Sequence, residues 1–449
     1  MIIKIREKFA HFYRRENIRA VVGNLLWLFF DKVLRVIISL IIGVWIARYL
    51  GPANYGIWSY ALAFVAIFAS LLGISLEPVL VRDLVRNNED VSTLLGSAWL
   101  IKFIGGIATL LSAIITIVLV GASDSTMIWL VGIVACGTII QSFNVMTLYY
   151  QAQLRLKYVV FAQNIALLLV MILKVVLVIQ KASLLSFVLA GVLEILLGVF
   201  FLGAIYLIGK EPRWSFDKKV ILRLLNDSWP LTIMAFTVMI QARIDQVMLG
   251  KMLGSAELGQ YSVALKVVEA FGFIPMMIYS TVSPVMTASH VQNKTLFYQR
   301  LVKIYRIMFG LFVMTALPLA LFGQKVVLIL FGSAYLPAGG LLALFSIRLL
   351  FANFGVAKGL FIANENLFRY SLVSGICGSV VNVVLNYVLI PLYASRGAIV
   401  ATLTSLFVMT FLVDLFFTKM RINLKLMLFG FLPFISIKNV LNIEKNKAF

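Results

Sequence analysis

Apolar stretches of about 20 residues follow one another along almost the whole chain, separated by short polar connections. A helix of about 20 apolar residues is long enough to cross the hydrocarbon core of a bilayer. The pattern therefore predicts an all-α polytopic membrane protein in which neighbouring helices form antiparallel hairpins. The twelve expected membrane-spanning helices are 23–47, 55–80, 93–120, 127–150, 158–180, 184–209, 225–250, 259–287, 302–322, 337–363, 370–391 and 397–418.

Composition agrees with this class of protein. Of the 449 residues 62% are hydrophobic, whereas soluble domains are nearer half apolar, and the mean hydropathy is +1.02. Cys136 and Cys377 both lie inside apolar stretches, so neither a disulfide nor a metal site is expected. His11 and His290 lie outside the predicted spans, which leaves no histidine for catalysis within the membrane. We expect no cofactor.

The basic residues divide unequally between the two sides of the membrane. The two tails and the even-numbered connections hold 25 Lys and Arg residues, and the odd-numbered connections hold five. Cytoplasmic segments of membrane proteins are enriched in Lys and Arg, so both termini are predicted to be cytoplasmic. The net charge of +21 is explained in the same way and does not require a nucleic-acid partner. We predict a multi-pass membrane protein.

One short segment occurs twice. When residues 47–65 are set against 250–268 without a gap, eight of 19 positions are identical, including the pairs Gly51/Gly254 and Gly56/Gly259. Six predicted spans separate the copies, so both copies face the same, extracytoplasmic side. This arrangement predicts two parallel repeats of six helices, related by an axis along the membrane normal, around a central cavity.

The repeat and the connections predict five regions. The longest connections between spans are polar and basic, and one of them lies between the sixth and seventh spans. After the last span, residues 424–437 are apolar but too short to cross a bilayer comfortably, which favours an interfacial segment. The regions are a basic cytoplasmic tail at 1–22, an N-terminal six-helix bundle at 23–209, a cytoplasmic linker at 210–224, a C-terminal six-helix bundle at 225–418 and a basic tail at 419–449.

Fifteen charged residues fall inside the predicted spans, which indicates a wet interior rather than lipid on all sides. One charge at the centre of a bilayer costs roughly 2.5–3.5 kcal/mol on insertion scales, so this number points to ions or polar cargo. Bases outnumber acids, and a cationic interior suits an anionic cargo. The bases are Lys32, Arg35, Lys102, Lys174, Arg243, Lys266, Arg306, Arg348 and Lys358; the acids are Asp31, Glu77, Glu194, Asp245, Glu269 and Asp414.

Several of these charges have a structural interpretation as well. Long side chains near span ends can extend to the interface, which we expect for Glu77, Asp414, Arg306 and Lys358. Asp31 and Arg35 (i,i+4) and Lys266 and Glu269 (i,i+3) can also pair along their own helices.

The candidate site residues follow from charge and polarity. Arginine binds phosphate bidentately and lysine acts as a point charge, so basic residues of the interior are the expected substrate contacts. Acidic residues would be their partners or proton carriers, and amides could bind sugars or a neighbouring helix. The cationic set is Arg35, Arg243, Lys266 and Arg348; the acidic set is Asp31, Asp245 and Glu269; the amide set is Asn382, Asn386 and Gln241.

Three segments carry a resemblance to a known family. These are RYLGPANYG at 48–56, YYQAQLRLKY at 149–158 and LFGSAYLPA at 330–338. With the basic tail and the polar first helix, they resemble the polysaccharide transporter family, the O-antigen flippases of the multidrug/oligosaccharidyl-lipid/polysaccharide (MOP) exporter superfamily. The resemblance covers essentially the whole chain, but its motifs are corners of the fold rather than substrate contacts.

The resemblance implies a membrane transporter and not an enzyme. It implies that an undecaprenyl-diphosphate-linked oligosaccharide passes from the cytoplasmic to the periplasmic leaflet of a bacterial inner membrane, by alternating access coupled to a gradient of an ion, H⁺ or Na⁺. Candidate partners are the lipid-linked oligosaccharide, a polysaccharide polymerase and a chain-length regulator.

Two other functions are weighed against this one. A cation-coupled multidrug exporter of the same superfamily would need a cavity acidic or neutral enough for cationic drugs, which the basic excess opposes. A membrane glycan polymerase or acyltransferase would need a large extracytoplasmic loop or an intramembrane histidine, and the sequence has neither.

Overall fold

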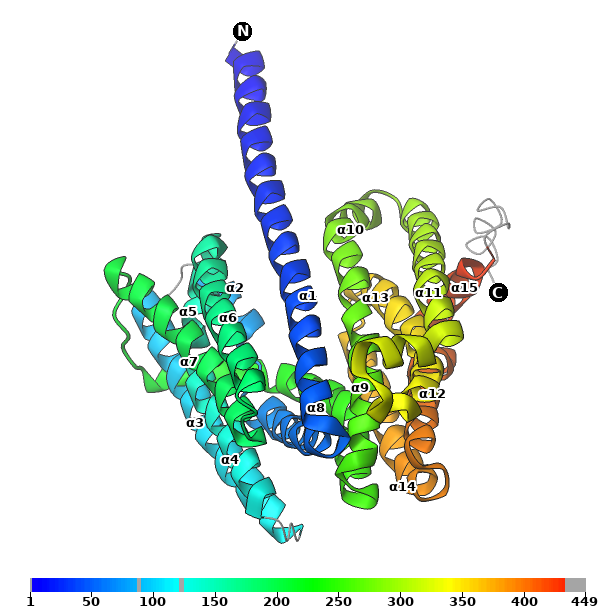
Figure 1. Cartoon of the computed structure of the whole chain (residues 1–449). Coiled ribbons are helices and arrows are strands. Elements are labelled where there is room, and N and C mark those ends of the chain that lie inside the picture. Colours follow the sequence, from blue (N-terminus) through cyan, green and yellow to red (C-terminus); the bar gives the residue numbers. More distant parts are fainter. Residues whose placement is uncertain (1, 87–89, 121–124, 433–449) are drawn as a thin grey trace. The chain divides into compact units, whose positions relative to one another are not determined.

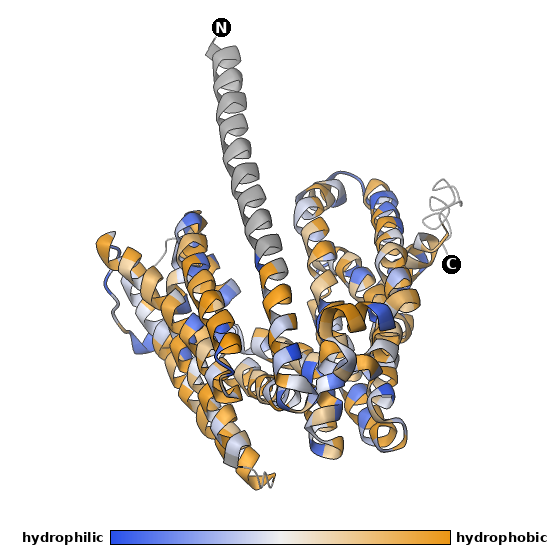
Figure 2. Cartoon of the chain, viewed as in Figure 1, coloured by the Kyte–Doolittle hydropathy of each residue, from blue (hydrophilic) through white to orange (hydrophobic). Residues whose placement is uncertain are grey.

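The computed structural model describes the backbone of residues 2–86, 90–120 and 125–432, and these residues form helices joined by short turns (Figure 1). Side chains in these ranges are described for Arg35 and from Ile38 onward, Ser125 excepted. The described part contains no strand, which confirms the all-α prediction. Apolar positions dominate most helices, and polar positions are scattered along them (Figure 2).

The helices keep the order predicted from the hydrophobic pattern. The long ones are α1 Ile2–Leu72, α3 Val91–Leu119, α4 Ser125–Ile140, α6 Leu156–Ile179, α7 Leu184–Ile208, α8 Lys218–Leu253, α9 Ser255–Phe271, α10 Phe273–Gln292, α11 Lys294–Phe331, α13 Arg348–Asn364 and α14 Phe368–Phe407. The short ones are α2 Glu77–Arg86, η1 Gln141–Asn144, α5 Val145–Ala152, η2 Ser333–Tyr335, α12 Leu336–Phe345, the π-helix η3 Val408–Leu412, η4 Val413–Phe416 and α15 Thr418–Gly430.

The predicted spans correspond to these helices, with changes at two breaks. Nine segments of the described chain are long and apolar enough to cross a membrane, and a tenth combines η2 and α12 with α13 across a 42° bend. Two continuous helices each contain two predicted spans and are divided at a non-helical residue: α1 at Gly51 (φ 69°, ψ 173°) and α14 at Ala394 (φ 51°, ψ −137°). The second predicted span ends at Leu72 rather than at 80.

The duplicated segments have the same local geometry. Gly254 has φ 91° and ψ 176°, close to the values of Gly51, and a helix begins directly after each glycine. Positive φ is accessible to glycine without a steric penalty, which explains why the corner requires this residue in both copies. The repeat read from the sequence is therefore also a repeat of backbone conformation.

The two copies pack against each other through small residues. A Cβ atom placed on Gly56 would lie 1.8 Å from the carbonyl oxygen of Ser255, and one on Gly259 would lie 2.0 Å from that of Pro52. Pro52 and Ser255 are equivalent positions of the repeat, as are Gly56 and Gly259. The contact is thus reciprocal, as expected where two repeats meet on the axis that relates them.

Contacts divide the chain into two compact units. The first comprises Met1–Gly43, Leu76–Ala108 and Cys136–Ser228, and the second Val44–Ser75, Thr109–Ala135 and Trp229–Phe449. These units do not coincide with the predicted six-helix ranges 23–209 and 225–418, which stay a prediction. The difference arises because parts of α1, α3 and α4 belong to the second unit.

Contacts within each unit follow the predicted alternation of connections. In the first unit, even-numbered connections meet: Arg155 Nη1 lies 3.3 Å from Glu211 Oε1, and the Ser215 amide donates to Ser92 O at 3.1 Å. In the second unit, odd-numbered connections meet where Lys251 Nζ donates to Val120 O at 2.7 Å. The helix order predicted from charge is therefore consistent with the structure, while the side of the membrane that each set faces stays a prediction.

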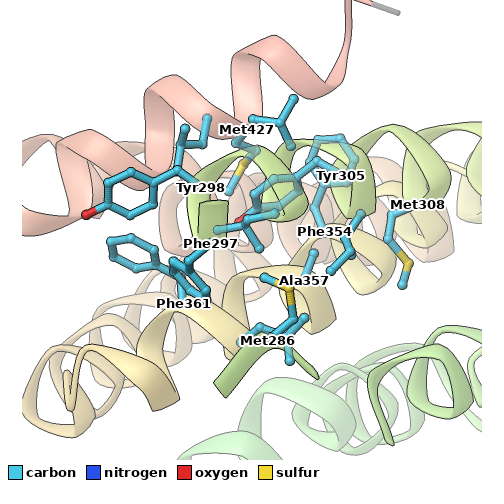
Figure 3. Close-up of a cluster of buried hydrophobic side chains, with 14 of the residues drawn as sticks. Met286, Phe297, Tyr298, Tyr305, Met308, Phe354, Ala357, Phe361 and Met427 are labelled. Carbon is cyan, nitrogen blue, oxygen red and sulfur yellow. The ribbon is translucent and has the colours of Figure 1, made fainter. Parts of the chain in front are cut away.

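The core of the second unit lies between α10, α11, α13 and α15. Aromatic side chains fill it, among them Phe297, Tyr305, Phe354 and Phe361, all of which are 1% exposed or less (Figure 3). The Tyr305 hydroxyl donates to Asn423 Oδ1 at 2.9 Å and so connects α11 to α15. The helix that begins the C-terminal region is thereby packed into this unit.

The interpretation that Lys358 and Asp414 extend to the interface is wrong. Lys358 Nζ lies 2.7 Å from Asp414 Oδ1, and their side chains are only 7% and 0% exposed. The two residues form a buried pair because α13 packs against the end of the α14–η3–η4 segment. Glu77, by contrast, pairs with Lys102 Nζ at 2.5 Å and remains half exposed.

Candidate functional site

The carboxylate of Asp245 is the centre of a buried polar network in the second unit. Asp245 lies in α8 and is 1% exposed, yet hydrogen bonds satisfy both of its oxygens. Oδ2 accepts from the Tyr261 hydroxyl and, at 3.3 Å, from the Thr402 hydroxyl, while Oδ1 accepts from the Gln246 amide at 2.7 Å. A carboxylate buried in this way is stabilised only by such donors and by nearby positive charge.

The network continues through amides and hydroxyls of α8 and α14. Asn382 Nδ2 donates to the hydroxyls of Thr402 and Ser405, each at 3.3 Å, and Asn386 Nδ2 donates to Asn382 Oδ1 at 3.0 Å. Gln241 Nε2 reaches the same Ser405 hydroxyl at 2.6 Å. Four candidate residues from distant parts of the sequence, Asp245, Gln241, Asn382 and Asn386, therefore belong to one assembly.

The amides of this network are engaged within the protein. Asn382 and Asn386 are fully buried, and their donors bind the α14 segment rather than an open surface. Asn382 binds the half of α14 that follows Ala394, which is the helix-binding role considered from the sequence, whereas Asn386 donates to Asn382 of its own helix. Gln241 Oε1 and Asn386 Oδ1 are buried without a hydrogen-bond partner among the described residues, so the assembly retains acceptor capacity.

Positive charge lies beside this network. Arg348, at the start of α13, and Arg243, two residues before Asp245 in α8, both act electrostatically on the Asp245 carboxylate. Arg348 is half-buried, and its Nη1 has no hydrogen-bond partner among the described residues. A guanidinium with free donors beside a buried carboxylate can bind an anion.

Arg243 and Glu269 form an ion pair, which differs from the pairing considered from the sequence. Arg243 Nη1 lies 3.3 Å from Glu269 Oε1, across the α8–α9 hairpin. Lys266 instead places its Nζ 5.8 Å from the centre of the Tyr55 ring, a cation–π distance. The expected i,i+3 pair of Lys266 and Glu269 is thus replaced by contacts with other helices.

A second polar site lies in the first unit, around Arg35. A cavity of ≈ 190 Å³ is lined by this arginine, by Glu194 and by three amide side chains that the sequence reading did not single out, Gln141, Asn144 and Gln163. Glu194 Oε2 accepts from Lys174 Nζ at 2.9 Å, and Lys174 is buried. Arginine, glutamate and amides lining one small cavity are the groups that recognise hydroxyl-rich or anionic molecules.

Two candidates are not placed in either site: Lys266, which lies against Tyr55, and Asp31. Asp31 lies in α1, but its side chain is outside the described residues. The described residues also contain no group of three or more His, Cys, Asp and Glu that could hold a metal ion.

Comparison with known proteins identifies the family. The model of the family described as "Polysaccharide biosynthesis protein" matches residues 21–290, which is more than half of the chain. The chain belongs to the polysaccharide biosynthesis protein family. No curated protein matches its sequence.

Solved structures show which fold this polysaccharide biosynthesis family member adopts. A multidrug resistance MATE family transporter of the MOP superfamily, in an inward-facing conformation, superposes with a TM-score of 0.71 at 14% identity, covering 87% of this chain and 94% of that one. The lipid II flippase MurJ superposes with a TM-score of 0.68 at 12% identity, and the match covers 94% of this chain and 100% of that one. A MOP superfamily transporter from Pyrococcus furiosus superposes with a TM-score of 0.58 at 14% identity, and the match covers 91% of this chain and 96% of that one. The MOP transporter fold expected from the sequence is confirmed.

Proposed function

We propose that this protein is a flippase that moves an undecaprenyl-diphosphate-linked oligosaccharide, an O-antigen or similar surface repeat unit, from the cytoplasmic to the periplasmic leaflet of the bacterial inner membrane. The observation that carries the proposal is the pair of polar, arginine-containing sites inside apolar helical units. A polysaccharide biosynthesis family is expected to handle glycans, and one protein of the same fold is a lipid II flippase.

The charges support an anionic, sugar-bearing cargo. Arg35, Arg243 and Arg348 are half-buried, so each guanidinium is partly desolvated and binds phosphate more strongly than in water. The amides beside Arg35 offer both donors and acceptors to sugar hydroxyls. In this proposal the diphosphate is held by arginines while the glycan passes polar side chains instead of lipid.

The Asp245 network is proposed as the ion-coupling site. Asp245 is the carboxylate of a cluster whose other hydrogen-bonding members are neutral hydroxyls and amides, so it can exchange a proton or hold a small cation, in competition with the positive charge of Arg348. A sodium ion is coordinated by hydroxyl and amide oxygens together with a carboxylate, whereas a proton binds to the carboxylate alone. Asn386→Ala should therefore lower the sodium dependence of transport if Na⁺ is coupled and leave the pH dependence unchanged.

The function is tested with the purified full-length protein in liposomes. An undecaprenyl-diphosphate oligosaccharide labelled on its sugar is placed in both leaflets, and an impermeant glycan-modifying reagent measures its exchange. We expect exchange with the native protein and a several-fold loss with Arg35→Gln, Arg243→Gln or Arg348→Gln. The matched control is Arg396→Gln, an exposed arginine outside both sites. Absence of exchange, or equal loss in the control, contradicts the proposal.

A multidrug exporter is the second candidate, because the fold is shared with a multidrug resistance MATE family transporter. The arginines of both sites oppose it, since they repel cationic drugs. Expression in a strain that lacks its own exporters separates the two functions. Resistance to cationic dyes would favour export, whereas restored surface glycan in a flippase-deficient strain favours flipping. A polysaccharide polymerase and a chain-length regulator are the proposed partners.

A further inference from the structure

A groove in the first unit lies outside both polar sites, where the α5–α6 corner meets the end of α7. Both corners turn through a residue with positive φ, Leu154 (59°) before α6 and Lys210 (50°) after α7. These turns bring Arg155 and Glu211 together, with 3.3 Å between Nη1 and Oε1. The Tyr149 hydroxyl donates to the other oxygen of Glu211 at 2.5 Å, so the rim is held in one arrangement.

The groove changes from polar to apolar along its length. Its volume is ≈ 1180 Å³, more than a drug-sized pocket of ~300–1000 Å³. Arg155, Lys157 and Tyr158 line the polar end, and Lys157 Nζ lies 5.0 Å from the centre of the Tyr158 ring. Farther along α6, Phe161 and Leu168 continue the groove and are 62% and 51% exposed, whereas Ile208 ends α7 beside the polar end.

This order of side chains matches the order of groups in a phospholipid. The charge count predicts that the α5–α6 corner faces the cytoplasm, where headgroups are polar and acyl chains begin a few ångströms deeper. Basic pockets between membrane helices on that side bind anionic headgroups. Tyrosine at the level of the headgroups adds a hydroxyl donor above an apolar ring.

Charge selects the class of lipid. Arg155 and Lys157 contribute two positive charges and Glu211 one negative charge, so the charged lining carries a net charge of about one. One unit of positive charge complements a phosphodiester, which carries a single negative charge. A diphosphate carries two or more and would leave charge uncompensated, so the groove suits a bilayer phospholipid better than a lipid-linked diphosphate.

We propose that this groove is a binding site for an anionic glycerophospholipid of the cytoplasmic leaflet, with the phosphodiester at Arg155 and Lys157 and an acyl chain along Phe161 and Leu168. The site is distinct from the polar sites proposed for cargo and coupling, and it does not depend on the flippase function. An occupied groove would fill the space between the cytoplasmic ends of α6 and α7.

The test is native mass spectrometry of the full-length protein, titrated in detergent with phosphatidylglycerol. We expect one phosphatidylglycerol to remain bound, with at least tenfold weaker binding of phosphatidylcholine. The double variant R155Q/K157Q should bind phosphatidylglycerol roughly tenfold or more weakly, because each Lys or Arg near an anionic headgroup contributes substantially to the binding of the lipid. The matched control, K218Q/K219Q, removes two exposed lysines of the same face outside the groove and should bind as the native protein does.

Two further arms test the tail and the source of the phosphate. Phe161→Ala shortens an exposed apolar side chain, so it should weaken phosphatidylglycerol binding while glycerol phosphate alone shows no binding to any variant. Undecaprenyl diphosphate should not displace phosphatidylglycerol from the native protein. Equal affinities for phosphatidylglycerol and phosphatidylcholine, unchanged affinity in R155Q/K157Q at an unchanged unfolding midpoint, or displacement by undecaprenyl diphosphate would each overturn the proposal.

Discussion

Lys358 and Asp414 are buried together in the second unit, with 2.7 Å between Nζ and Oδ1. Neighbouring groups form further hydrogen bonds with both charged side chains. Lys358 Nζ also donates to the carbonyls of Met409 and Thr410, each at 3.0 Å, and the Tyr370 hydroxyl donates to Asp414. Those carbonyls belong to the π-helix η3. Its wider turn interrupts the regular i→i−4 backbone hydrogen bonds, so carbonyl oxygens there are available to accept from the lysine.

We predict that removing either member of this pair destabilises the protein. Lys358→Met or Asp414→Leu leaves one buried charge without its partner, which costs about 3–5 kcal/mol. The double variant K358M/D414L removes both charges and should recover most of that loss. Unfolding midpoints in detergent are the measurement, with the exposed Lys419→Met as control. Midpoints that shift no further in the single variants than in this control would show that the pair contributes little.

Gly56 and Gly259 should each be intolerant of a methyl group. In either case a Cβ would overlap a backbone carbonyl of the other repeat, and a backbone cannot move aside as a flexible side chain can. Gly56→Ala and Gly259→Ala are expected to reduce the yield of folded protein and its transport. Gly310→Ala is the control, because the Cβ of this helical residue meets open space and alanine favours a helix by up to about 1 kcal/mol. Native behaviour of both G56A and G259A would contradict the close approach.

Glu365 should make stability depend on acid pH. Burial raises the pKa of its carboxyl, but the hydrogen bond with His290 at 2.9 Å and the charge of Lys294 at 3.4 Å lower it by more, so the pKa lies below its ordinary value of 4.5. A depressed pKa in the folded state means that the carboxylate stabilises the fold above pH 4.5 and that this contribution is lost as the pH falls through the folded value.

The variant Glu365→Gln tests this relation. At pH 7 the free energy of unfolding of this variant should be about 1–2 kcal/mol lower than that of the native protein, because the variant lacks the hydrogen bonds of the charged carboxylate. As the pH falls below 4.5, the two proteins should become equally stable. Chemical unfolding at a series of pH values provides the measurement. A difference that stays constant across this range would exclude the carboxylate as its source.

The Arg243–Glu269 pair allows structure and transport to be separated. Both side chains are about one third exposed, so the ion pair should contribute only about 0.2–1 kcal/mol to stability. Glu269→Gln is therefore expected to change the unfolding midpoint little. The swapped variant R243E/E269R should fold as the native protein does but transport several-fold less, because the cation proposed to bind the cargo has moved to α9. Native transport by the swapped variant would assign the pair a structural role alone.

The hydrophobic pattern was sufficient to predict the helices, because the length of an apolar segment is set by the thickness of the membrane and is visible in the sequence. It could not show that the chain stays helical between the spans divided at Gly51 and Ala394, where one non-helical residue makes the whole corner. The repeat was predicted correctly from Gly51 and Gly254, since a required positive φ leaves a recognisable residue.

Partners of charged residues were harder to predict than their positions. Glu269 has a possible partner three residues earlier on its own helix, yet it pairs with Arg243 of α8, because the packing of neighbouring helices decides which cation is nearest. Lys358 and Asp414 lie 56 positions apart, so no local spacing links them. The amides beside Arg35 were missed, although other amides were selected from the sequence. An amide side chain in an apolar span does not show by its position whether it lines a cavity or packs against another helix.

The reciprocal packing of Gly56 and Gly259 resembles an isologous interface, in which residue i of one subunit contacts residue j of the other and j contacts i. In a symmetric dimer the same contact would form between two copies of a half-length chain. Here one polypeptide supplies both sides, so each side is free to change independently. The chain keeps the symmetric contact in its glycines, while the helices that follow have diverged in charge: Lys266 and Glu269 of α9 are equivalent to Ala63 and Ala66 of α1.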